Sequence, residues 1–183
     1  HFSGRLMCPF VFAGSICRQL LENKGISLGS HISSVGDIND KAFDPVNISK
    51  TVLESLSQSE FPVINQEVKS IIERKILSIK SQGDSIGGTI ECGIVGVPAG
   101  MGDPIFDNIE SKISSIIFGI PAVKGIEFGR GFDSSRILGS ENNDNYIIDE
   151  EGKISTETNN HGGILGGISS GMPIIFKVAF KPT

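Results

Sequence analysis

The sequence predicts an α+β fold built in layers, and three observations favour this class. Helical and strand patterns follow one another along the chain without the regular alternation of a βαβ fold. A length of 183 residues is enough for one domain with its own apolar core. The composition, 38% hydrophobic and 20% charged, argues against wholesale disorder. We therefore expect one domain over residues 1–183.

Residues 4–24 show the most apolar helical pattern in the chain. Apolar side chains occupy nearly every side of its first half, and a helix of this kind is normally buried. Ser3 is a suitable N-cap, and Gly25 is a suitable terminating glycine. The sequence thus predicts a buried helix at the start of the domain.

Three further helices are expected. A short one covers residues 46–57, and an amphipathic one over residues 65–80 is capped by Asn65. Asp107 and Glu110 have the spacing of a capping box, and they mark the start of the third helix. Its inward-facing residues are predicted to be Ile109, Ile113, Ile116 and Ile117.

Period-two alternation predicts strands over residues 26–33, 89–97 and 172–180, with a short strand at 126–128. Residues 132–138 are expected to form one or two helical turns. In the first strand, Ile26, Leu28 and Ile32 alternate with Ser27, Gly29, His31 and Ser33. We expect the apolar set of this half-buried strand to face the core.

Residues 140–160 are polar and acidic, and we interpret them as a mobile loop with a small hairpin around Glu151 and Gly152. A glycine-rich segment follows at 162–171. It could let a planar or phosphorylated ligand press on bare backbone, but a plain turn explains it equally well. It is not a dinucleotide fingerprint, because no strand precedes it.

Charge and composition exclude several classes of function. Sixteen basic and 21 acidic residues give a net charge of −5, which disfavours a nucleic-acid partner. No apolar run approaches the roughly 20 residues of a membrane span. Cys8, Cys17 and Cys92 are odd in number and scattered, which predicts a reducing, cytoplasmic location.

No known catalytic motif stands out from the residues alone. His1, His31 and His161 show no metal-ligand spacing, so no metal site is expected. A Gly-x-Ser-x-Gly hydrolase motif is absent. The turn at 83–88 lacks the lysine of a phosphate-binding loop, and its Asp84 and Ser85 are as readily explained by a hairpin turn as by a cleft.

The start of the first helix suggests an anion site. Free N–H groups at a helix N-terminus attract phosphate or carboxylate, and Ser3 and Arg5 would bind it. His1 and Phe2 could add a polar tip and an aromatic wall. An ordinary N-cap beside an exposed arginine is an equally good interpretation.

Taken together, the turns resemble segments of the chorismate synthase family. The matching segments run in order along the chain: His1-Phe2-Ser3-Gly4-Arg5, residues 83–88 (GDSIGG), 96–100 (GVPAG), 120–127 (IPAVKGIE), 129–132 (GRGF), 139–140 (GS), 143–144 (ND), 160–168 (NHGGILGGI) and 181–183 (KPT). The resemblance implies a layered β-α-β sandwich in a homotetrameric, cytoplasmic lyase of the shikimate pathway. Such an enzyme converts 5-enolpyruvylshikimate 3-phosphate to chorismate by 1,4-anti elimination of phosphate and requires reduced FMN.

The resemblance also implies roles for individual residues. The flavin-contacting positions would be His1, Phe2, Ser3, Pro121, Ala122, Gly166, Lys181, Pro182 and Thr183. Ser3 and Arg5 match positions that grip the substrate anion. Pro121 stands where some members have Asn, so a side-chain amide contact is lost there.

The family's catalytic segments are not found in this sequence. A Gly-Glu-Ser-His-Gly segment and a Pro-x-His-Ala-Asp segment carry its catalytic histidines, and an Arg-x-Asp segment carries a carboxylate. We therefore assign no catalytic residue, expect a partial domain, and predict that this chain alone does not turn over. The alternative is a non-catalytic flavin- or phosphate-binding module or an assembly module. Whether the parent enzyme reduces its own flavin with NADP stays open.

Overall fold

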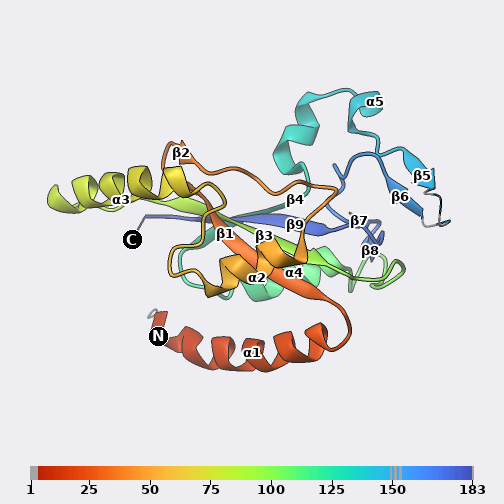
Figure 1. The fold of residues 1–183 in the computed structure, drawn as a ribbon, viewed down its shortest axis with the longest axis horizontal. Coiled ribbons are helices and arrows are strands. Elements are labelled where there is room, and N and C mark those ends of the chain that lie inside the picture. Colours follow the sequence, from red (N-terminus) through yellow and green to blue (C-terminus); the bar gives the residue numbers. More distant parts are fainter. Residues whose placement is uncertain (1–3, 149, 151, 153, 183) are drawn as a thin grey trace.

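A five-stranded antiparallel sheet forms the centre of the fold (Figure 1). The computed structural model describes residues 4–148, 150, 152 and 154–182. The strand order is β2-β1-β3-β9-β4. The strands are β1 (Ser27–Val35), β2 (Ile38–Asn39), β3 (Gly88–Val95), β4 (Val123–Phe128) and β9 (Ile174–Phe180). This arrangement confirms the α+β class.

Two short hairpins and seven helical segments surround the sheet in the described residues. The hairpins pair β5 (Tyr146–Ile148) with β6 (Ile154–Thr156), and β7 (Ile164–Leu165) with β8 (Ile168–Ser169). The α-helices are α1 (Cys8–Glu22), α2 (Lys50–Gln58), α3 (Gln66–Ser81), α4 (Ile109–Ile117) and α5 (Gly139–Asn142), with 3-10 helices η1 (Gly4–Met7) and η2 (Gly131–Arg136). The hairpin expected near Glu151 is the β5–β6 pair.

The strand register separates the sheet into two chemically different faces. Cys92 pairs with Phe176, whereas Glu91 pairs with both His31 and Lys177. Because successive side chains point to opposite sides, Cys92 and Phe176 lie on one face, and Glu91, His31 and Lys177 lie on the other. We call them the apolar face and the polar face.

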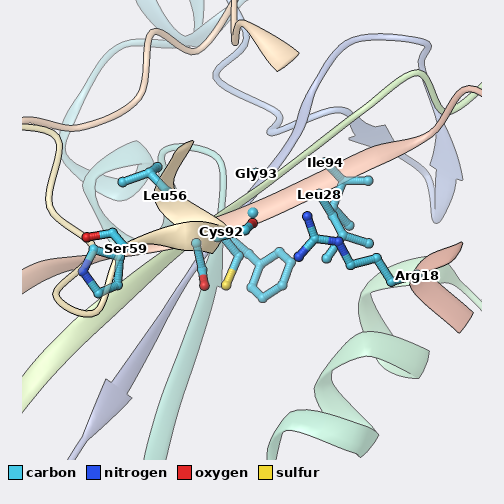
Figure 2. Close-up of a pocket in the computed structure, with 12 residues that line it drawn as sticks. Arg18, Leu28, Leu56, Ser59, Cys92, Gly93 and Ile94 are labelled. Carbon is cyan, nitrogen blue, oxygen red and sulfur yellow. The ribbon is translucent and has the colours of Figure 1, made fainter. Parts of the chain in front are cut away.

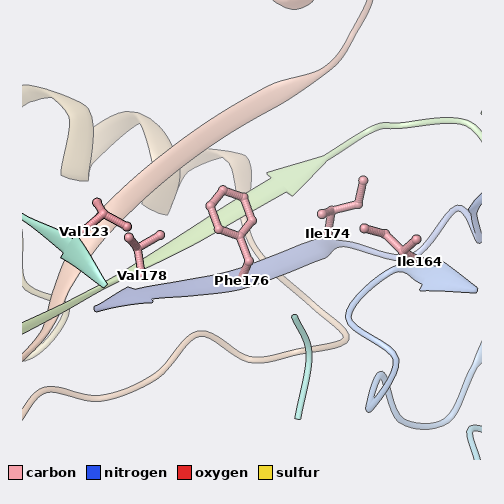
Figure 3. Close-up of a cluster of buried hydrophobic side chains, with 5 residues drawn as sticks. All are labelled: Val123, Ile164, Ile174, Phe176 and Val178. Atoms are coloured by element: carbon pink, nitrogen blue, oxygen red, sulfur yellow. The ribbon is translucent and has the colours of Figure 1, made fainter. Parts of the chain in front are cut away.

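The apolar face carries the larger core cluster, shown in Figure 3. Its buried members are Val123, Ile164, Ile174, Phe176 and Val178. Helix α4 packs on this cluster through Ile109, Ile113 and Ile117, as the sequence predicts. The prediction for Ile116 is wrong, because its side chain is 63% exposed on the far side of the helix.

The polar face is covered by residues 40–65, which we call the strap. Helix α2 lies within it and buries Leu53 and Leu56 against Phe43. The fit is close, since a Cβ on Gly29 would lie 2.9 Å from the Leu53 carbonyl oxygen. Glycine is needed there to let the helix approach the strand.

The strap reverses the expected burial of β1. Ser27, Gly29 and His31 are buried, while Leu28 and Ile32 are only half-buried. Of the predicted apolar set, Ile26, just before β1, is buried, but the prediction that the set faces the core is wrong for Leu28 and Ile32. The polar set lies under the strap, and the apolar set faces the side of α1.

Helix α1 is where the structure departs furthest from the sequence expectation. None of its residues is buried, and its large apolar side chains are exposed: Phe10, Val11, Phe12, Ile16 and Leu20. The prediction of a buried helix is wrong for the described chain, in which no second layer covers α1. The predicted end is correct, because Gly25 adopts a positive φ and Ile26 N–H donates to the Leu21 carbonyl at 3.0 Å.

The helix caps give one confirmation and one correction. The Asn65 side chain accepts the Glu67 N–H at 3.0 Å and caps α3, as predicted. At α4 the cap is Asn108, whose side-chain oxygen accepts the Ser111 N–H at 2.6 Å. The capping box assigned to Asp107 and Glu110 is therefore wrong by one residue. Among the described residues, no helix has both the length and the apolarity to cross a bilayer.

Candidate functional site

Two of the predicted flavin-contacting segments meet at one end of the sheet. The Lys181 N–H donates to the Ala122 carbonyl at 2.9 Å, which places residues 121–122 beside residues 181–182. Gly87, from the turn at 83–88, lies against the same point, because a Cβ on it would be 3.2 Å from Pro182 Cδ. Three segments that are distant in the sequence thus form one cluster.

Ala122 has an unusual backbone conformation in this cluster. Its φ is +71°, in the left-handed region that residues with a Cβ seldom adopt. Such strain persists only where the surroundings fix it, and it is enriched at ligand sites. With exposed Lys181 and Pro182 beside it, the cluster presents an apolar proline ring and a cation to solvent.

Gly166 lies elsewhere. It belongs to the turn between β7 and β8, whose next residue, Gly167, accepts the Ile109 N–H at 3.2 Å at the start of α4. Ala122 follows the other end of that helix, so the nine residues of α4, about 13 Å in length, separate the two positions. The structure does not bring Gly166 together with Ala122 and Lys181.

The glycine segment instead meets the segment at 96–100. The Gly100 N–H donates to the Ser169 carbonyl at 2.9 Å, and the Ser169 hydroxyl donates to the Pro98 carbonyl at 2.6 Å. A cavity of about 750 Å³ lies here between the segment 96–99, the β7–β8 hairpin and the β5–β6 hairpin. Its lining includes Tyr146 and Ile154.

The predicted anion site is described only in part. Arg5 is exposed in η1, and α1 itself begins at Cys8 with Pro9 in its first turn. The free N–H groups of the α-helix therefore lie further along the chain than expected. His1, Phe2, Ser3 and Thr183 lie outside the described residues. In Figure 1, η1 and the end of β9 lie toward the same end of the molecule.

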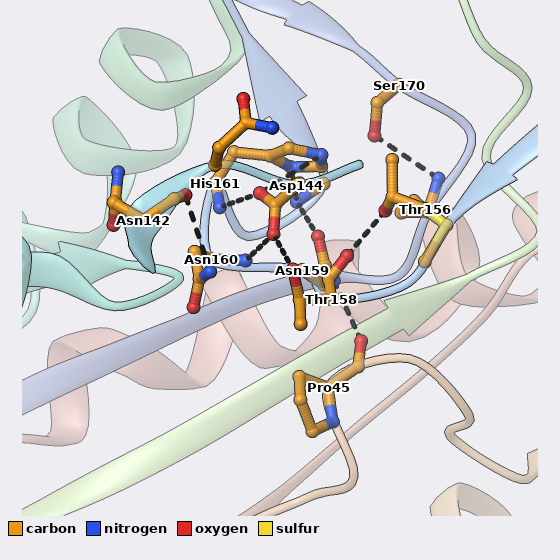
Figure 4. A network of polar contacts seen from close by, with 12 residues as sticks. Pro45, Asn142, Asp144, Thr156, Thr158, Asn159, Asn160, His161 and Ser170 are labelled. Atoms are coloured by element: carbon orange, nitrogen blue, oxygen red, sulfur yellow. Dashed lines mark hydrogen bonds and ion pairs between the residues drawn. The ribbon is translucent and has the colours of Figure 1, made fainter. Parts of the chain in front are cut away.

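A polar network that the sequence did not suggest anchors the glycine segment (Figure 4). The Asp144 carboxylate accepts the Asn160 N–H at 2.8 Å, the His161 N–H at 2.9 Å and the Thr158 hydroxyl. The Asn159 amide donates to the Pro45 and Pro173 carbonyls, each at 2.8 Å. The network therefore ties the 140–160 segment to the strap and to Pro173, the residue before β9.

His161 is held within this network in one tautomer. Its Nδ1 accepts the Gly163 N–H at 2.9 Å, so the ring proton is on Nε2. That nitrogen is buried, lies 3.7 Å from Asp144 Oδ2, and has no hydrogen-bond partner in the part of the chain that the structure describes. Burial lowers the pKa of His161 despite the opposing attraction of Asp144. In the sequence, His161 belongs to the family-like segment 160–168, but nothing there indicated that its ring is buried beside Asp144.

A second cavity, of about 380 Å³, opens on the apolar face between α1 and the sheet (Figure 2). Its lining includes Arg18, Leu28, Ser30, Cys92 and Phe176. The Arg18 side chain reaches over it while its Nε donates to Glu22 at 2.8 Å. Burial, with a smaller effect of the Glu91 charge, raises the pKa of the Cys92 thiol to about 12. Cys92 is therefore a poor nucleophile.

Comparison with known proteins places this arrangement in a family. The sequence model of chorismate synthase matches residues 1–183. The chain belongs to the chorismate synthase family. It is 44% identical over 184 residues to the chorismate synthase of Pyrococcus abyssi, covering 100% of this chain and 49% of the relative. The chorismate synthase of Methanobrevibacter smithii is 44% identical over 183 residues, covering 99% and 48%.

The fold shows the same relationship. A crystal structure of a chorismate synthase superposes with a TM-score of 0.91 and 31% identity, covering 99% of this chain and 57% of that one. The chain spans about half the length of the curated relatives it matches. Both comparisons confirm the family suggested by the turn motifs.

Proposed function

We propose that this chain is the flavin-binding portion of a chorismate synthase, which eliminates phosphate from 5-enolpyruvylshikimate 3-phosphate to form chorismate. The observation that carries the proposal is the cluster of Ala122, Lys181 and Pro182 with Gly87. Family membership supports the reaction, and the cluster supports the location of the cofactor.

The chemistry of the cluster fits a flavin. A flat ring system needs a surface without large projecting side chains, and Ala122 provides it, while Gly87 lets its turn pack closely against Phe180 and Pro182. The Lys181 ammonium, whose stem is exposed, would contribute positive charge to the bound group. When bound, reduced FMN would supply electron density to the substrate as phosphate leaves.

The other predicted contacts extend the proposal. His1, Phe2, Ser3 and Thr183 would complete the cofactor site, and Ser3 and Arg5 would bind the substrate anion. Gly166 lies at the opposite end of α4, so its proposed contact with the flavin is independent of the Ala122 and Lys181 cluster. We further propose that the whole enzyme is a cytoplasmic homotetramer.

Titration of FMN against this chain, followed by flavin fluorescence, tests the site. We expect saturable binding that Lys181→Met weakens about tenfold, since a charge-assisted contact is lost. Lys112→Met is the matched control, because Lys112 is an exposed lysine on α4 and is not one of the flavin positions. Equal affinity for all three proteins would refute the assignment of Lys181.

Chorismate formation with reduced FMN tests the expected lack of turnover. The two described histidines, His31 and His161, are both buried, and neither matches a family catalytic segment. A general acid or base must reach the substrate. We therefore expect flavin binding without chorismate formation, and robust turnover would overturn this expectation.

An assembly role is a second candidate, and the exposed apolar surface of α1 favours it. Exposed apolar patches of this kind mark interaction surfaces. Analytical ultracentrifugation measures the oligomeric state, and the FMN titration measures cofactor binding. An assembly module would oligomerise through α1 without binding FMN.

A further inference from the structure

The polar face of the sheet holds a buried carboxylate that is only half satisfied. Glu91 is 3% exposed. Its Oε2 accepts the Phe43 N–H at 2.8 Å and lies 2.9 Å from His31 Nε2. Among the described residues, the polar group nearest to its Oε1 is the Lys177 ammonium, at 3.8 Å, which is too long for a hydrogen bond. Oε1 is thus the carboxylate oxygen that stays available to a bound group.

A small cavity lies at this point, on the side of the sheet opposite α4. Its volume is about 260 Å³. Glu91, Ile175 and Lys177 line it from the sheet, and the remaining walls are formed by Ala42, Phe43, Pro45, Gly129, Arg130, Asn159 and Asn160. The cavity therefore combines one carboxylate, two cations and an apolar wall.

The three charged side chains of the cavity, Glu91, Lys177 and Arg130, come from different parts of the fold. Lys177 projects from β9, with its side chain 36% exposed. Arg130 follows β4, and its Nη1 lies 3.5 Å from Asn160 Oδ1, while its backbone N–H donates to the Asn160 carbonyl at 2.8 Å. The neighbouring Glu127 turns toward η2, where its carboxylate accepts the Phe132 N–H at 3.3 Å.

A simple anion does not suit this set, because Glu91 Oε1 would repel it. A ligand with adjacent positive and negative groups suits it better: an ammonium would approach Oε1, and a carboxylate would approach Lys177 and Arg130. We propose that this cavity binds a free α-amino acid with an apolar side chain of moderate size. The side chain would lie against Phe43, Pro45 and Ile175.

The size of the cavity agrees with this class. At the ~30 Å³ that a water molecule occupies in the liquid, the cavity holds roughly nine water-sized groups. Leucine has a similar number of non-hydrogen atoms. Leucine is therefore the probe we would use.

The test is isothermal titration of this chain with L-leucine. We expect saturable one-site binding, and an affinity loss of about tenfold or more in Arg130→Gln and in Lys177→Met. Arg136→Gln is the matched control, because Arg136 is an exposed arginine on η2 outside the cavity, and it should change affinity less than twofold, about the scatter expected of a surface change. Arg130 is exposed, so its variant is expected to fold even if Lys177→Met does not.

Two leucine analogues separate the charges. N-acetyl-L-leucine lacks the ammonium group, and L-leucinamide lacks the carboxylate, so both should bind at least about tenfold more weakly than leucine. Absence of leucine binding up to its solubility limit would overturn the proposal. So would equal affinity of Arg130→Gln, or N-acetyl-L-leucine binding as tightly as leucine, which would indicate a plain anion site.

Discussion

The two faces of the central sheet are closed in different ways. On the polar face, charged groups are buried and paired: His31 lies 3.0 Å from Asp40 and 2.9 Å from Glu91, under the strap. On the apolar face, α4 packs on the core cluster, but α1 leaves its apolar side chains in solvent. The polar face is covered by a segment that hydrogen bonds hold in place. The apolar face is covered only where a helix packs its own apolar side chains against it.

The comparison shows what the strap does for the polar face. The Asp40 carboxylate accepts the Ile64 N–H at 2.6 Å and the Asn65 N–H at 2.9 Å, and Glu91 accepts the Phe43 N–H. Both carboxylates therefore fix the strap at its two ends and hold His31 between them. Phe43 adds a T-shaped ring contact to His31 at 4.8 Å between centroids.

Removing one member of this buried set should have the largest effect. Glu91→Ala leaves His31 Nε2 and the Phe43 N–H without their acceptor, so we expect a loss of about 3–5 kcal/mol in the free energy of unfolding. Glu73→Ala, on the exposed side of α3, should change it by less than about 0.5 kcal/mol. Urea denaturation of both variants measures the difference, and similar midpoints would contradict the importance of the polar face.

Thiol labelling compares the surroundings of strand β3, which carries Cys92, with those of α1, which carries Cys8 and Cys17. With a pKa of about 12, Cys92 should be nearly unreactive toward iodoacetamide, because only the thiolate attacks. Cys8 and Cys17 are exposed on α1 and should be labelled about a hundredfold faster or more. Mass spectrometry of the labelled peptides over time gives the three rates. Comparable rates would mean that the apolar face is open at Cys92 as well.

Sequence reasoning predicted what depends on local pattern. The period-two alternation of β9 and the apolar repeat of α4 agree with the observed core except at Ile116, because both elements face one layer of their own chain. The burial of β1 was predicted the wrong way round, since it depends on the strap crossing its polar side. Local pattern carries no information about which face a distant segment covers.

The candidate site shows the same limit. Recognition of the turns brought Ala122 and Lys181 to attention, and the structure places them in contact. The resemblance could not show that Gly166 lies at the other end of α4, nor that the Asp144 carboxylate lies beside the His161 ring. Both relationships are set by long-range packing. Family resemblance identifies positions, whereas their distances depend on the fold.

The same substitution in two helices sharpens the comparison of α1 with α4. Ile113→Ala should lower the free energy of unfolding by about 1–3 kcal/mol, because Ile113 packs on the core cluster. Ile16→Ala should cost less than about 0.5 kcal/mol, since Ile16 is 47% exposed. Equal losses, measured by urea denaturation, would show that α1 is packed in solution by a surface that this chain provides.

A smaller, pH-dependent effect should come from the Asp144–His161 network beside the strap. Burial lowers the pKa of His161 below its usual 6.5, so the unfolded chain takes up a proton more readily than the folded one. Stability from this group is complete above 6.5 and is lost as the pH falls from there through the folded pKa. Asp144 acts in the same direction at lower pH: burial would raise its pKa, but hydrogen bonds from Thr158, Asn160 and His161 outweigh this and lower it below 3.8.

Substitution of His161 tests this assignment. In His161→Leu the Gly163 N–H keeps its bond to Asn159 Oδ1 at 2.9 Å, so the network should survive without the titrating group. As the pH falls from neutral to just below 6.5, we expect the free energy of unfolding to decrease less in the variant than in the unsubstituted chain. The urea midpoint at each pH measures this decrease. An identical decline in both proteins would place the acid sensitivity in another group. Protonation of Nδ1 removes one of the two acceptors of the Gly163 N–H and leaves Asn159 Oδ1 as the other, so the first segment to loosen should be the glycine turn that follows His161.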